Sequence, residues 1–344
     1  MFSTRTFFIL GVNRMLKRTH SIRHLACLEI LVLTSVAGAA RAADAPLRWK
    51  FKAGEQLDYV MQREVEGKMN LMGSELAFKM GMAFDVAWKI QSVAADGTAQ
   101  VDLTVDRVQL NMASPLGGDL KYDTKGEGKL SGPAAAMMGP VIEGMLGQPI
   151  KAKISSLGEV SDIVLPDKLQ EVFKKQQASP NRQQGFGMGG TGFSERGIKE
   201  LVTKSVLPLP AETGTDVTWK QHFENPIPRA GIQMTDITYS LAGPGTEDGK
   251  PVTKIAAETE LTFEPEENPM ADVEIASQEG KSMFYFDTSA GRMLKAEGVQ
   301  SFVMEISGPR EMTQDVKETV KMYVGKSPDP KPAEKKADDK KDAK

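Results

Sequence analysis

The chain has 344 residues, and its 43 lysines and arginines nearly balance 46 aspartates and glutamates, for a formal net charge of −3. This mildly acidic balance argues against non-specific nucleic-acid binding, which needs a basic surface. The single cysteine, Cys27, lies near the start, so the remainder has no disulfide, no thiolate nucleophile and no cysteine-ligated metal site.

Residues 1–42 have the pattern of a cleavable signal peptide that starts at Met1 or Met15. Basic residues precede an uncharged apolar run at 30–40, and small residues precede the expected cleavage site near Ala42. The run is much shorter than the roughly 20 residues of a membrane span. We therefore predict export to the periplasm or the exterior, which leaves a mature chain with a formal charge of −8. An uncleaved interfacial helix is the alternative.

The first part of the mature chain predicts a β-meander. Apolar and polar residues alternate strictly over 78–90, which indicates a long strand with one buried face. Residues 57–71 alternate in the same way, and Gly67 within them predicts a bend or a bulge. A third strand is expected over 101–105.

The middle of the chain predicts helices and a loop. One helix is expected over 133–145, with proline at its start, a second over 167–177, and a third that Ser194 caps. A hairpin is expected over 150–164. The polar, glycine-rich residues 179–193 predict a mobile loop.

The remaining part returns to the meander style. Strands are expected over 237–241, 255–263, 283–287, 302–306 and 312–324. Trp49-Lys50 and Trp219-Lys220 each open one half, a weak hint of duplication. The predicted fold class is therefore α+β and dominated by β, with large antiparallel meander sheets around a short helical insertion. Whether two similar halves form one sheet or two domains stays open.

We expect five segments along the chain. Residues 326–344 hold seven lysines, five acids and three prolines and no large apolar residue, so they predict a disordered, charged tail. The segments are a signal peptide (1–42), a first β-meander (43–112), a helix-containing insertion (113–210), a second β-meander (211–325) and the tail (326–344).

Motifs for chemistry are scarce. His222 is the one histidine after residue 42 and suits a strand surface better than a metal site or a general base. A G-x-G-x-x-G pattern at 185–190 follows a polar loop where a dinucleotide site needs a strand. The acids at 264–272 suit a solvated loop better than a calcium site. We therefore predict no catalytic, cofactor-binding or metal-ligating residues.

Methionine is abundant, because seventeen of the nineteen lie after residue 42. Several fall on the apolar faces of predicted strands and in the first helix. Methionine adapts to varied apolar shapes, so these positions predict either ordinary core filling or an apolar ligand face between sheet and helices. The candidate residues are Met61, Met69, Met80, Met82, Phe84, Trp88, Met138 and Met145.

Three segments carry a family resemblance: 49–55 (WKFKAGE), 157–163 (LGEVSDI) and 207–219, which opens LPLP and closes VTW. Over roughly 45–325 the chain resembles exported bacterial proteins, many from planctomycetes, that share a domain of unknown function. The resemblance implies a structural likeness and transfers no catalytic residue and no cofactor.

Three functions follow as hypotheses. The first is an exported, non-catalytic envelope protein that binds an apolar ligand or a protein partner in a methionine-rich groove. The second is a structural or adhesive envelope protein without a ligand cavity. The third, and least favoured, is a hydrolase that uses paired carboxylates.

Overall fold

The computed structural model describes residues 46–328, except 72, 114, 116–117, 127–129, 131, 179–193, 213, 215, 228–229, 268, 270 and 309–310. The predicted signal peptide, the glycine-rich loop and residues 329–344 lie outside the described residues. The described residues all belong to one compact unit.

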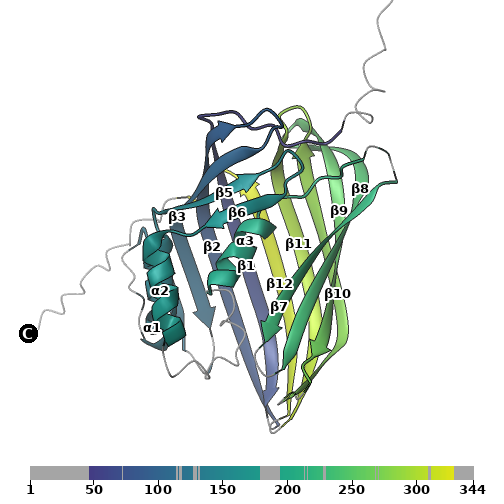
Figure 1. Ribbon diagram of the computed structural model, residues 1–344. Helices are drawn as coiled ribbons and strands as arrows, with labels where there is room; N and C mark the ends of the chain where they lie inside the picture. The colour runs from purple at the N-terminus through teal and green to yellow at the C-terminus, as the bar shows by residue number, and fades with distance from the viewer. Residues whose placement is uncertain are drawn as a thin grey trace, which may run out of the picture. The chain divides into compact units, whose positions relative to one another are not determined.

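The described residues form one antiparallel sheet of twelve strands that does not close into a barrel (Figure 1). Its order is β6-β5-β3-β2-β1-β12-β11-β10-β9-β8-β7, with β4 paired to β3. The first six strands are β1 (Gln56–Leu71), β2 (Ser74–Val93), β3 (Ala99–Ala113), β4 (Leu120–Asp123), β5 (Pro149–Ile154) and β6 (Val160–Val164). The others are β7 (Thr218–Ile227), β8 (Gly231–Glu247), β9 (Lys250–Pro265), β10 (Asp272–Asp287), β11 (Arg292–Ser307) and β12 (Met312–Val324).

The two halves of the chain join through their terminal strands. β1 pairs with β12 from Tyr59 opposite Val324 to Leu71 opposite Met312. The predicted antiparallel, β-dominated fold is confirmed, and the open question is answered, because both halves contribute to one continuous sheet.

Three helices complete the described structure: α1 (Gly132–Met145), α2 (Asp167–Ala178) and α3 (Glu195–Lys204). They confirm the predicted helices, and the Ser194 side chain accepts a hydrogen bond from the Gly197 backbone, as a capping residue does. α1 packs on α2 and on β3, and α3 packs on β6. Arg196 of α3 also donates to the backbone oxygen of Glu224 in β7, so α3 contacts both edge strands.

The sheet has two unlike faces. The side that carries Phe84, Trp88 and their cross-strand partners faces the helices and is here called the inner face. The outer face carries most of the charged side chains, such as Glu64 and Lys79. Alternation along each strand separates the two faces, as the sequence pattern predicts.

Of the two features predicted at Gly67, a bend or a bulge, the bulge is wrong. The pairing of β1 with β2 and with β12 runs through Gly67 without a register shift. Glycine is needed there because a Cβ atom would lie 2.4 Å from the Phe78 ring and 2.7 Å from the backbone oxygen of Asp315. The Phe78 ring of the neighbouring strand thus lies directly over Gly67. The described register shifts of this region lie between β2 and β3, at Asp85–Val86 and at Ile90–Ser92.

Candidate functional site

One part of the inner face is closely packed. Trp88 is fully buried, and its ring lies 5.1 Å from that of Tyr59 and 5.9 Å from that of Trp49. Met82 and Phe84 of β2 are buried in the same cluster as Met138 and Met145 of α1. Five of the eight predicted site residues are therefore core residues: Met82, Phe84, Trp88, Met138 and Met145.

The other three predicted residues differ. Met61 and Met80 are half-buried and pack against this cluster. Met61 stands opposite Phe84, and Met80 stands opposite Val65. Met69 is half-buried further along β1 and lies outside the cluster. The structure thus brings seven of the eight residues together and leaves Met69 apart.

A more open part of the inner face lies beside Met61, on β12 to β9. Val320 of β12 is 40% exposed although it points to the same side as the buried Met322. The positions next to it across the sheet are small, because Gly298, Ser282 and Ala257 follow on β11, β10 and β9. Because these side chains are short, less side-chain volume covers the sheet here than in the packed part of the inner face.

A charged pair stands in the open part. Arg63, opposite Val320, donates to both carboxylate oxygens of Glu318, with Nε–Oε1 at 2.7 Å and Nη2–Oε2 at 2.9 Å. The Arg63 side chain is 43% exposed and that of Glu318 is 20% exposed. Sequence reasoning missed this pair. The sequence did offer one signal, because Arg63 is a charged residue at a position of the 57–71 alternation that should point inward.

The segments that carry the family resemblance meet at one place. The indole nitrogen of Trp49 donates to the Leu207 backbone oxygen at 2.9 Å, and that of Trp219 donates to the Pro208 oxygen at 3.0 Å. Gly158 (φ +80°) lies so close that a Cβ atom would be 2.2 Å from the Leu207 oxygen. These motifs therefore hold the start of the chain, the β5–β6 turn and the segment after α3 together.

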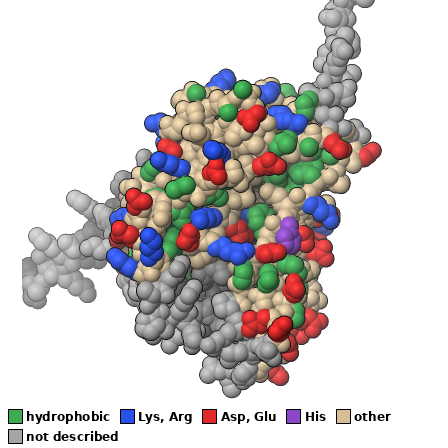
Figure 2. Space-filling view, viewed as in Figure 1, with side chains coloured by type: hydrophobic (Ala, Val, Ile, Leu, Met, Phe, Trp, Pro, Cys, Tyr) green, Lys and Arg blue, Asp and Glu red, His purple; other side chains and the backbone are tan. Residues whose placement is uncertain are grey.

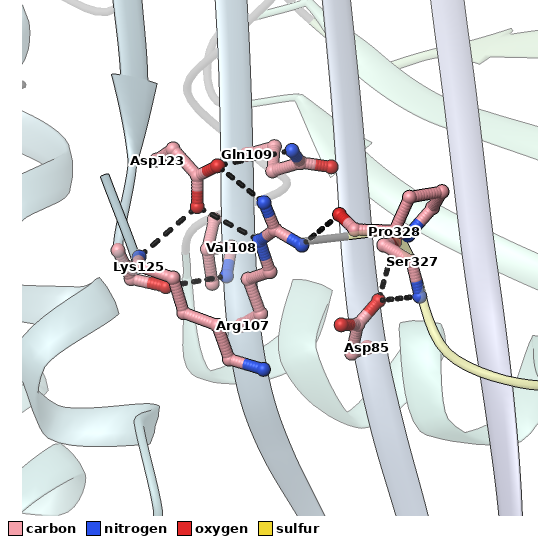
Figure 3. Close-up of polar contacts among 9 residues, drawn as sticks. Asp85, Arg107, Val108, Gln109, Asp123, Lys125, Ser327 and Pro328 are labelled. Atoms are coloured by element: carbon pink, nitrogen blue, oxygen red, sulfur yellow. Dashed lines mark hydrogen bonds and ion pairs between the residues drawn. The ribbon is translucent and has the colours of Figure 1, made fainter. Parts of the chain in front are cut away.

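A polar cluster lies on the outer face of β2 and β3 (Figure 3). Arg107, only 1% exposed, donates through Nε and Nη2 to the two oxygens of Asp123 at 2.9 and 2.6 Å. Gln109 and the Lys125 backbone also donate to Asp123. The bonds from Arg107 stabilise the ionised carboxylate and lower the pKa of Asp123 to about 2.

The same cluster holds the start of the expected tail. Beyond β12 the chain crosses the outer face of β1, β2 and β3 in turn. Gly325 donates to the Asp58 backbone oxygen at 2.9 Å, and Ser327 donates to Asp85 through its amide at 3.1 Å and its hydroxyl at 2.5 Å. Arg107 then donates to the Pro328 oxygen at 2.7 Å (Figure 3). Residues 326–328, here called the strap, are thus bonded to the sheet, so the expected solvated tail remains a prediction for 329–344 alone.

His222 lies on the outer face, as expected of a strand histidine. Its Nδ1 is 2.9 Å from Asp236 and its Nε2 is 3.5 Å from Glu224. The hydrogen bond with Asp236 is the main reason that the pKa of His222 is raised. Within the described residues, no group of three or more histidines, cysteines and acids is placed to hold a metal ion.

Two surface depressions of about 380 Å³ each lie elsewhere. One is on the outer face, around Met283 and Val299, and the other is at a sheet end, around Leu294 and Tyr323. Neither is lined by a residue of the predicted ligand face. Among the described helices, none has the length and apolar character of a membrane span.

The fold and site define an α+β protein with one open antiparallel sheet and a partly covered inner face. The chain belongs to DUF6263, a family of unknown function, whose model matches residues 96–301. This match includes two of the three resembling segments and leaves out 49–55. It names no source organism and no compartment, so the expected origin and export stay predictions. No curated protein matches the chain.

Three solved structures are similar at low identity. Lipovitellin, described for its lipid–protein interactions, matches at 12% identity and TM-score 0.38 over 84% of this chain, which spans 27% of the lipovitellin chain. A candidate exported protein of Bacteroides fragilis with a YmcC-like fold matches at 8% and 0.21, over 82% of this chain and 100% of its own. A DUF1329 family protein of Desulfovibrio piger matches at 10% and 0.15, over 76% and 84%. At these scores the likenesses carry no functional argument.

Proposed function

We propose that this protein is an exported, non-catalytic binder of an apolar chain, held on the open part of its inner face. The observation that carries the proposal is the 40% exposure of Val320 in the open part of the inner face, beside the packed apolar cluster. When another apolar group covers this exposed side chain, apolar surface is removed from water, and this burial favours binding.

The neighbouring side chains suit a ligand of variable shape. Met61 and Met80 are half-buried at the margin of the packed cluster. An unbranched thioether side chain rearranges at little cost, so both can follow the outline of an acyl chain. The small residues Gly298 and Ser282 leave room for it beside Val320.

Arg63 supplies polarity at the same place. Its bonds to Glu318 use Nε and Nη2, so among the described residues Nη1 has no hydrogen-bond partner. Guanidinium groups bind carboxylates and phosphates well. The ligand class that fits best is therefore an amphiphile with one acyl chain and an acidic head group.

The first test measures binding of the fluorescent fatty acid cis-parinaric acid by the mature protein. We expect Val320→Asp to weaken binding roughly tenfold or more, because the charge would lose water on contact with an apolar chain. Val299→Asp is the matched control, since Val299 is 44% exposed on the opposite face. Equal effects of both substitutions, or no binding by folded wild type, would contradict the proposal.

The second test addresses the head group. Arg63→Gln should weaken cis-parinaric acid about fivefold and leave its methyl ester unchanged, because the ester carries no charge for Arg63 to bind. Native mass spectrometry of protein purified from its own cells then identifies the natural ligand class. Equal loss for acid and ester would show that Arg63 shapes the face without binding the head group.

A further inference from the structure

The ladder between β9 and β10 is incomplete. β9 runs to Pro265 and β10 begins at Asp272, but within the described residues they pair only from Thr253 opposite Phe286 to Glu258 opposite Lys281. Residues 259–265 of β9 and 272–280 of β10 therefore leave backbone groups along facing edges without ladder partners. We call this interval the seam.

A side chain takes the place of a backbone partner inside the seam. The Gln278 amide donates through Nε2 to the Leu261 oxygen at 2.8 Å and accepts from the Leu261 amide at 2.6 Å. A backbone residue in an antiparallel ladder makes the same two bonds. The Gln278 side chain thus fills the space between strands that stand too far apart here for direct backbone pairing. The backbone N–H and C=O of Leu261 both point toward β10, as they would in a ladder.

Charge disfavours a longer ladder. If the register continued beyond Glu258 and Lys281, Glu260 would stand directly opposite Glu279, and like charges in that position destabilise a sheet. The strands are still close together at Gly280, where the absence of a side chain matters, because a Cβ atom there would lie 2.8 Å from that of Thr259. The strands separate just beyond this close approach.

The borders of the seam are strongly acidic. Figure 2 shows red side chains gathered at the lower right, where Figure 1 places the lower ends of β8 to β10. Exposed acids stand along both strands and the residues that follow β9: Glu258, Glu260, Glu264, Glu266, Glu267, Asp272, Glu274 and Glu279. Lys281, beside them, is already paired with Glu279 at 2.6 Å.

We propose that the seam binds an extended, basic segment of a partner protein as an added β-strand. Such a strand pairs with the free edge of β9 and displaces the Gln278 amide. Its lysines, on the outer side, lie between Glu260 and Glu279 and are attracted to both carboxylates. Its apolar residues, on the inner side, lie against Leu261 and Phe263, which point inward.

The probe is the synthetic peptide (Lys-Val)4, whose alternation matches this arrangement. We expect saturable binding to the mature protein, and slower hydrogen exchange of the amides in 259–264 when peptide is bound. A peptide methylated on alternate backbone nitrogens should bind at least about tenfold more weakly, because it cannot donate to the β9 edge. Equal binding of both peptides, or no binding, would overturn the proposal.

Two variants test the seam itself. Gln278→Ala should raise peptide affinity severalfold, since the peptide no longer competes with the Gln278 amide for Leu261. If Gln278 only stabilises the fold, its removal would leave the peptide affinity unchanged. Glu279→Lys should weaken peptide binding, because it places a cation opposite Glu260 and favours closure of the ladder. The matched control is Glu171→Lys on α2, which makes the same change of charge away from the seam.

Thermal unfolding verifies that each variant is folded before binding is measured. If Glu279→Lys and Glu171→Lys weaken binding equally, the attraction is one of overall charge and the seam is not the site. If Gln278→Ala binds no better than wild type, the claim that the peptide takes the place of the amide is wrong.

Discussion

Asp123 shows how one outer-face acid stabilises a buried cation. Arg107 is 1% exposed, and its guanidinium would be costly to bury without the Asp123 carboxylate. The pKa of Asp123 is therefore about 2 in the folded chain, below its ordinary value of 3.8. A lowered folded pKa means that the contribution to stability is complete above pH 4 and disappears as the pH falls toward 2.

Substitution of Asp123 tests this directly. Asp123→Asn should lower the free energy of unfolding by about 1–3 kcal/mol at pH 7, because the charged partner of Arg107 is lost. The difference from wild type should shrink between pH 4 and pH 2. Urea unfolding at a series of pH values measures it, and Asn at the exposed Asp119 is the control. A difference that does not change with pH would contradict the assignment.

Gly67 gives a second prediction at this scale. Gly67→Ala should destabilise the chain by about 1–3 kcal/mol, because the new Cβ would collide with the Phe78 ring and the Asp315 backbone. Gly81→Ala on the adjacent strand is a matched control, since its Cβ would have its nearest neighbour at 3.9 Å. Chemical denaturation compares the two, and equal losses would show that strand propensity, not the contact, decides the cost.

At the scale of elements, sequence patterns located the three helices and the long strands of the first meander, but the strands of the second meander are much longer than predicted. For example, the predicted strand 283–287 is only the end of β10. The alternation over 78–90 and the cap at Ser194 are local signals, so a single sequence reveals them. The incomplete β9–β10 ladder could not be predicted, because it depends on which strand lies opposite Glu260. The strap was missed for the same reason, since its partners Asp85 and Arg107 are more than 200 residues away in sequence.

The strap predicts different outcomes for two truncations. Deletion of 329–344 should leave stability unchanged, because the described bonds end at Pro328. Deletion of 326–344 should cost about 1–3 kcal/mol, because it removes the partners of Asp85 and one partner of Arg107. Denaturant unfolding of both chains gives the comparison, and equal stabilities would mean that water replaces the strap without loss.

For the whole molecule, the sheet is the unit of stability. Of the six methionines predicted as part of a ligand face, three belong to the core, two lie at its margin and one lies apart. They are Met82, Met138 and Met145, then Met61 and Met80, then Met69. Sequence reasoning identified the correct side of the strands, because burial follows alternation. It could not separate the packed part from the open part, since helix α1 covers only some of the inner face and no local pattern records this.

A continuous sheet predicts one cooperative unfolding transition. Deuterium exchange of peptides from β2–β3 and from β8–β9 should lose protection at the same urea concentration, because β12 joins the two groups through β1 and β11. Two separate midpoints would instead indicate that the halves behave as independent domains.

The position of β12 also determines the order in which the chain can be completed. Among the described strands, β12 is the last to leave the ribosome, yet it lies in the middle of the sheet, between β1 and β11. Until residues 312–324 are available, β1 and β11 are both unpaired edges, which attract other strands. Pairs such as Tyr59 with Val324 span most of the sequence, and such distant pairings form slowly. The central part of the sheet can therefore be completed only after residues 312–324 have been synthesised.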